Sequence, residues 1–142
     1  MHAMLVLKLL VMATFLFVLF ALTRAARYAR EMRYSLTSEP DLHESFPLHK
    51  RWATATFVST LVGVVLAETM VRVHGGLAPG SLTTFVLHIV CATLFFSVIS
   101  LLRFRLTGLR SGKLPIHRAL GYISFLFYVG MFLTGAVLMI QL

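Results

Sequence analysis

The stretch FVLHIVCATLFFSVISLL, residues 85–102, is a run of 18 residues without a charged side chain. A helix needs about 20 mostly apolar residues to cross a bilayer, and this run lies in a segment of that length, from about Leu82 to Leu102. Similar apolar segments cover about residues 4–22, 52–73 and 119–140. The sequence therefore predicts an all-α integral membrane protein, a bundle of four transmembrane helices.

The composition indicates a membrane protein with a single domain. Of the 142 residues, 58% are hydrophobic and 13% are charged, whereas a soluble domain has about 25% charged residues. Four spans leave no room for a soluble catalytic domain, and no hydrolase motif is present, so we expect one domain over residues 1–142 and no enzyme. The single cysteine, Cys91, excludes an internal disulfide and a cysteine-based zinc site.

The first apolar segment lies where a signal peptide would lie. Its apolar run is long for a signal peptide, and LTRAARYAR, residues 22–30, is a poor cleavage site. We therefore interpret this segment as a transmembrane helix.

The lysines and arginines predict the orientation of the bundle. Of the 13 such residues, 11 lie in or beside the two longer connections, and only Lys8 and Arg72 lie elsewhere. The positive-inside rule then places both long basic loops in the cytoplasm and both termini outside. The net charge of +8 fits this topology and a contact with anionic membrane lipids, so we expect no nucleic acid as a partner.

The longest polar piece is the cytoplasmic basic segment, residues 24–48. TRAARYAREMRY, residues 23–34, predicts a continuation of the first helix, with an arginine every three residues from Arg24 to Arg33. This face is either a docking surface for a partner or anionic lipid, or a solvated anchor that fixes the topology. TSEPDLHESFP, residues 37–47, then ends the helix.

One short phrase occurs twice, as PLHK at residues 47–50 and PIHR at residues 115–118. Proline suits the first turn of a helix, so His49 and His117 should each lie in the first turn of a span. Both helices start on the cytoplasmic side, which places the two histidines at matched depth. The helix N-termini and the adjacent basic residues favour the neutral imidazole, the form that binds iron, copper or zinc. The alternative is that both histidines are ordinary interfacial residues.

A second polar set is predicted nearer the external side. Glu68 and His88 lie at equal distances in sequence from the external turn, and counting along the other helices places Lys8 and Thr134 at a similar depth. These four residues predict a buried polar layer that serves as a metal site, a proton relay or a contact with a cofactor. The alternative is structural, with Glu68 paired to Arg72 and His88 hydrogen-bonded in the bundle.

Depth separates the histidines into two sites. His88 lies ~22 Å from the plane of His49 and His117, at 1.5 Å per helical residue. The three cannot bind one ion. We therefore predict a metal site at His49 and His117, with His88 as a separate cofactor-binding candidate on the external side.

Three segments resemble a bacterial four-helix membrane family of unknown function, the CtaM (YozB) family. The likeness covers residues 46–142 and is carried by HKRWATATFVSTLVGVVLAE from residue 49, FVLHIVCATLFFSVISLLRFRLTG from residue 85 and HRALGYISFLFYVGMFLTGAVLMIQL from residue 117. The family's span histidines correspond to His49, His88 and His117. The resemblance implies the bacterial inner membrane and a role in building haem-copper oxidases of the respiratory chain.

Three functions remain open on these grounds. The first is an accessory or assembly protein of a respiratory complex that binds haem b or copper through its span histidines. The second is a b-type cytochrome electron-transfer subunit with a stable haem, to which HRALGYIS is loosely similar. The third is a purely structural small subunit, without a cofactor, of a larger membrane complex.

Overall fold

The computed structural model describes residues 2–34, 44–76, 80–104 and 114–141. They form four α-helices, α1 (His2–Tyr34), α2 (Ser45–His74), α3 (Leu82–Phe104) and α4 (Leu114–Gln141), and these described ranges contain no strand. Each helix is long and apolar enough to cross a membrane. The prediction of an all-helical chain with four potential spans is confirmed.

The helices are longer than the apolar runs that predicted them. α1 continues beyond the predicted end near residue 22 to Tyr34, as the arginine-rich pattern predicted. α2 begins at Ser45 rather than near residue 52, and α4 begins at Leu114 rather than near residue 119. Apolar length marks only the part of a helix that suits lipid, whereas backbone hydrogen bonds continue the helix through its polar ends.

A pair of glycines ends α2. Gly75 has φ 88°, a left-handed conformation that glycine adopts without a steric penalty. Its N–H donates to the carbonyl of Arg72 at 3.2 Å, and the N–H of Gly76 donates to the carbonyl of Val71 at 3.1 Å. These two bonds form a Schellman motif, which satisfies carbonyls that the helix end would leave unpaired. Residues 77–79, which include Pro79 of the predicted external turn, lie outside the described residues.

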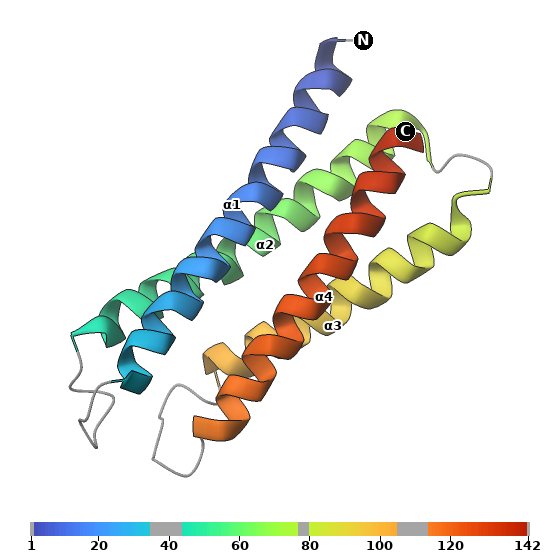
Figure 1. Cartoon of the computed structure of the whole chain (residues 1–142). Helices are drawn as coiled ribbons and strands as arrows, with labels where there is room; N and C mark the ends of the chain where they lie inside the picture. The colour runs from blue at the N-terminus through green and yellow to red at the C-terminus, as the bar shows by residue number, and fades with distance from the viewer. Residues whose placement is uncertain (1, 35–43, 77–79, 105–113, 142) are drawn as a thin grey trace.

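The helices alternate in direction and form two antiparallel pairs (Figure 1). α1 packs mainly against α2 and α3 mainly against α4, with fewer contacts between the pairs. α1 and α3 therefore finish at the end of the bundle where α2 and α4 begin, and both chain termini lie at the opposite end (Figure 1).

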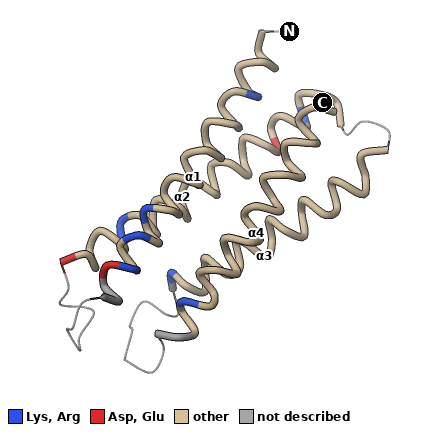
Figure 2. Tube along the Cα trace, in the orientation of Figure 1, with Lys and Arg blue, Asp and Glu red and all other residues tan. Residues whose placement is uncertain are grey.

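Positive charge gathers at the end where α2 and α4 begin (Figure 2). We call it the basic end; the lysines and arginines whose side chains are described there are Arg24, Arg27, Arg30, Lys50, Arg51, Arg103 and Arg118. Lys8 and Arg72 lie toward the opposite end, as the sequence predicted. Arg105, Arg110 and Lys113 of the second basic loop lie outside the described residues.

Small residues allow α1 and α2 to approach closely. Thr56, Thr60 and Gly63 are buried on one face of α2, and a Cβ atom at Gly63 would lie 3.4 Å from the Thr14 methyl group. Helices in a membrane associate through such close packing because lipid provides no hydrophobic driving force.

A compact core joins α1, α3 and α4. It consists of Val18, Phe95, Ile99, Tyr128 and Met131. The rings of Phe95 and Tyr128 lie 5.5 Å apart, and the buried Tyr128 hydroxyl donates a hydrogen bond to the Phe15 carbonyl of α1. A phenol buried in apolar surroundings needs such a partner.

We expect Tyr128→Phe to lower the stability of the purified protein by about 1 kcal/mol, because it removes the hydroxyl that links α4 to α1. Thermal unfolding in detergent should then occur a few degrees lower. Tyr122→Phe is the matched control, because the side chain of Tyr122 is 69% exposed. Equal melting temperatures for the two variants would contradict this account of the core.

Candidate functional site

The structure brings His49 and His117 together at the basic end. His49 is the fifth residue of α2 and His117 the fourth of α4, so both lie just after the first-turn prolines. Their ring centroids are 5.8 Å apart and their planes are inclined at 65°. The structure thus places the two residues at one depth and in contact, and metal binding by them stays a prediction.

A backbone carbonyl of α1 orients the His49 ring. The Nδ1 atom of His49 lies 2.8 Å from the Ala25 carbonyl oxygen. A carbonyl only accepts hydrogen bonds, so Nδ1 carries the proton and Nε2 carries the free lone pair. This arrangement is typical of metal-binding histidines, whose other ring nitrogen donates to a carbonyl or carboxylate.

His117 differs from His49 in its hydrogen bonding. Its Nδ1 atom is buried and has no hydrogen-bond partner within the described part of the chain. A buried polar atom without a partner is costly. The imidazole therefore retains binding capacity beside its neighbour.

The distance between the rings suits a shared ligand atom. With metal–nitrogen bonds of about 2.0–2.1 Å, two imidazoles on one ion have ring centres about 5 Å apart at a tetrahedral angle and about 6.4 Å apart on opposite sides of the ion. Among the described residues, no group of three or more His, Cys, Asp or Glu side chains is placed to hold a metal ion. Two neighbouring imidazoles could hold a group that takes two protein ligands, such as haem iron or copper.

Basic side chains lie at the same end of the bundle as the histidine pair. Lys50 and Arg118 follow the two histidines directly and are exposed. Arg103 of α3 is half-buried, and its Nε atom donates to the Thr54 hydroxyl at 3.1 Å. This positive charge favours an anionic ligand, or a ligand with anionic substituents.

The second candidate, His88, contacts α4 far from the pair. Its Nδ1 atom lies 3.0 Å from the Met131 carbonyl and 3.1 Å from the Thr134 hydroxyl. Met131 lies fourteen residues beyond His117, or ~21 Å along the helix. The structure agrees with the prediction that His88 cannot share an ion with His49 and His117.

The four residues of the predicted polar layer do not form one cluster. His88 and Thr134 are in contact, but the ammonium group of Lys8 donates instead to the Met139 carbonyl at 3.0 Å. Met139 is five residues beyond Thr134, so this contact lies ~7 Å nearer the helix end.

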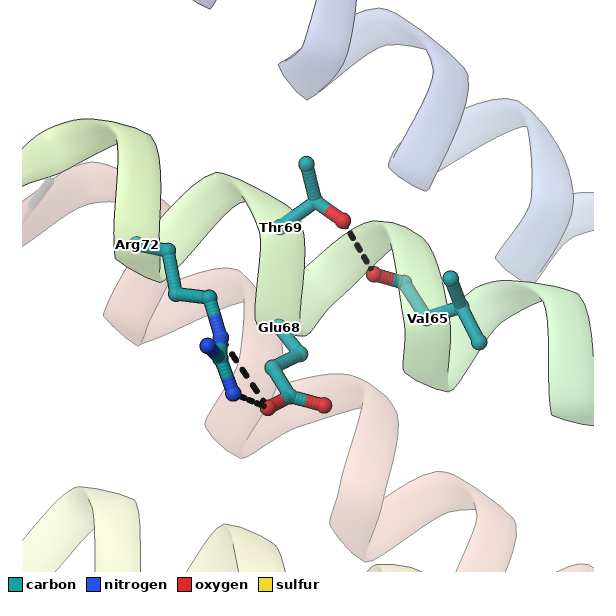
Figure 3. Close-up of polar contacts among 4 residues, drawn as sticks. All are labelled: Val65, Glu68, Thr69 and Arg72. Atoms are coloured by element: carbon teal, nitrogen blue, oxygen red, sulfur yellow. Dashed lines mark hydrogen bonds and ion pairs between the residues drawn. The ribbon is translucent and has the colours of Figure 1, made fainter.

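Glu68 has a local partner and an exposed position. It binds the guanidinium of Arg72 at 3.1 and 2.5 Å, the i,i+4 pair that the structural alternative predicted (Figure 3). The side chains of Glu68 and Arg72 are 59% and 78% exposed. The expectation that Glu68 lies in a buried layer with His88 is therefore wrong. Depth along a helix can be counted from sequence, but the direction of a side chain around the helix axis cannot.

Two features of the site were not predicted. The Ala25 carbonyl that orients His49 gives no signal in the sequence, because any residue provides a carbonyl. The aromatic surroundings of Arg24 do give one, because Phe20 and Tyr28 lie four residues before and after it on the same helical face.

No known protein family, curated protein or solved structure matches this chain. The resemblance to the CtaM family therefore stays a prediction.

Two glycines of α4 offer a test of the His88 contact. A Cβ atom at Gly135 would lie 3.0 Å from Cε1 of His88, whereas a Cβ at Gly121 would meet nothing within 4 Å. We expect Gly121→Ala to keep or raise the melting temperature, because alanine favours a helix by about 1 kcal/mol over glycine. Gly135→Ala should melt lower than Gly121→Ala, because the His88 ring must shift away from its hydrogen bonds.

Differential scanning fluorimetry of both variants in one detergent measures this difference. A Gly135→Ala protein that melts at or above Gly121→Ala would show that the ring is not held as described.

Proposed function

We propose that this chain is an accessory or assembly membrane protein of a respiratory complex of the haem-copper oxidase type, and that it binds haem b or copper between His49 and His117. The observation that carries the proposal is the 5.8 Å contact of the two rings, with the Nε2 lone pair of His49 left free by the Ala25 carbonyl. Haem or copper would supply redox chemistry at this position, and the chain's own residues would supply binding and orientation.

The positions of α2 and α4 support a bound group between them. Among the described residues α2 and α4 are not packed against each other along their length, whereas the His49 and His117 rings in their first turns are 5.8 Å apart. Gly121 lies one turn after His117, and a side chain there would meet only open space. The basic end would also accept the carboxylates of a haem.

The cellular setting belongs to the same proposal. The excess of lysine and arginine at the basic end favours a cytoplasmic position for the histidine pair, with both termini outside. The resemblance stated above favours the bacterial inner membrane and a larger respiratory complex as the partner. We infer a carrier or assembly role for the histidine pair, in which the two imidazoles bind and release a group.

The alternative of a b-type cytochrome with a stable haem rests on the same pair. In this alternative the same two imidazoles, whose rings lie 5.8 Å apart, would hold the haem iron, and the haem would supply electron transfer. A stable haem would remain through purification, whereas an assembly factor would release its haem or copper to a partner.

The testing experiment is the optical spectrum of the detergent-purified protein, oxidised and then reduced with dithionite, before and after loading with haem or with Cu(I). We expect the unaltered protein to bind about one haem or one copper per chain. The double variant His49→Ala/His117→Ala should bind haem or copper at least tenfold more weakly, because the variant lacks both proposed protein ligands.

The matched control is His2→Ala/His74→Ala, which removes two exposed histidines at the opposite end. Haem with sharp reduced bands in the protein as purified would favour the cytochrome. Two results would contradict the proposal. One is full binding by the His49→Ala/His117→Ala protein, and the other is no binding of haem or copper by the unaltered protein. The second result would favour a structural subunit.

A further inference from the structure

Arg24 has an unusual environment at the basic end. The carbon of its guanidinium lies 5.8, 5.7 and 5.8 Å from the ring centroids of Phe20, Tyr28 and Trp52. Its Nε atom is buried without a hydrogen-bond partner within the ranges described. By contrast, Arg27 is paired with Glu31 at 3.0 Å. The rings hold the Arg24 cation in place, but they do not neutralise its charge.

An apolar groove lies deeper along the same two helices. It has a volume of about 300 Å³, near the lower limit for a small-molecule site. It lies in the middle part of the spans of α1 and α2. Its lining residues are Leu10, Ala13, Thr14, Phe17, Ser59 and Val62.

The groove and Arg24 belong to one continuous seam. On α1, Ala13, Phe17, Phe20 and Arg24 are spaced by four, three and four residues, so they share one helical face. The ring of Phe20 lies 6.4 Å from that of Phe17 and 5.3 Å from that of Trp52. These aromatic contacts connect the cation at the basic end to the groove.

The length of the seam matches half a bilayer. Ala13 and Arg24 are eleven residues apart, which is ~16 Å along a helix. Half of a hydrocarbon core of ~30 Å is ~15 Å. A lipid whose phosphate lies at Arg24 would therefore bring the end of an acyl chain to the groove.

We propose that this seam binds one anionic phospholipid, with its phosphate on the Arg24 guanidinium and one acyl chain in the groove between α1 and α2. Arginine is well suited to this role because its planar fork of N–H groups binds phosphate oxygens through paired hydrogen bonds. The exposed Phe17 and Phe20 rings provide the apolar contact between headgroup and groove. The site lies on the outer side of α1 and α2 and does not depend on the histidine pair.

The test is native mass spectrometry of the full chain in mild detergent, titrated with dioleoylphosphatidylglycerol and, in parallel, with dioleoylphosphatidylcholine. We expect one phosphatidylglycerol per chain, bound more tightly than phosphatidylcholine. Arg24→Gln should weaken its binding by about fivefold or more, the factor that one basic residue contributes at an anionic surface. Arg24→Lys should bind phosphatidylglycerol with an affinity between those of the unaltered protein and Arg24→Gln. Lysine keeps the positive charge but lacks the planar guanidinium group.

Each substitution has a matched control. Arg30→Gln removes the same charge from an exposed position elsewhere on α1, and it should leave the affinity within about twofold because it does not face the seam. Ala13→Leu fills the groove and should weaken phosphatidylglycerol binding. Ala3→Leu makes the same change at an exposed site outside the groove and should not.

Four results would overturn the proposal. They are an equal effect of Arg24→Gln and Arg30→Gln, unchanged binding by Ala13→Leu, displacement of the lipid by millimolar inorganic phosphate, and equal binding of the two lipids. The third would assign the site to free phosphate. A dimer that Ala13→Leu converts to a monomer, with lipid binding unchanged, would assign the seam to a second copy of the chain.

Discussion

The alternating direction of the four helices is the constraint on which the histidine contact depends. Connections of seven to ten residues between successive helices return the chain antiparallel to the preceding helix, so α2 and α4 begin at the same end of the bundle. First-turn prolines then fix where those helices start relative to His49 and His117. A helix that ran the other way would separate the two rings by the thickness of the bilayer.

Polar side chains inside the bundle bind backbone carbonyls of neighbouring helices. His49 uses Ala25, His88 uses Met131, and Lys8 uses Met139. Tyr128 uses Phe15 in the same way. A carbonyl that is already part of a helix has a second lone pair, so these donors are satisfied without breaking the backbone ladder. These contacts also fix the proton of His49 and of His88 on Nδ1, because a carbonyl cannot donate.

Position along the helices could be predicted from the sequence, and rotation around their axes could not. Apolar length and the charge of the loops gave the four helices and the matched depth of His49 and His117. The direction of Glu68 was not settled in this way, because apolar residues lie on both the exposed face (Val65 and Val73) and the buried face (Met70) of this part of α2. The position of Lys8 beside Met139 was not settled in this way either. Arg24 could have been found, because aromatic residues at i−4 and i+4 are visible in the sequence.

One turn of α1 connects the two proposed sites. Ala25 is 5% exposed and faces α2, where its carbonyl orients His49, whereas the adjacent Arg24 lies on the outer seam against Trp52. Trp52 follows His49 by three residues, so both lie in one turn of α2. In this turn His49 contacts Ala25 of α1 and Trp52 contacts Arg24 of α1. A helix turn held between these contacts has little freedom to rotate. The orientation of His49 therefore depends on the packing of the seam as well as on the hydrogen bond to Ala25, even though a lipid in the seam and a ligand at the histidines would have no atom in common.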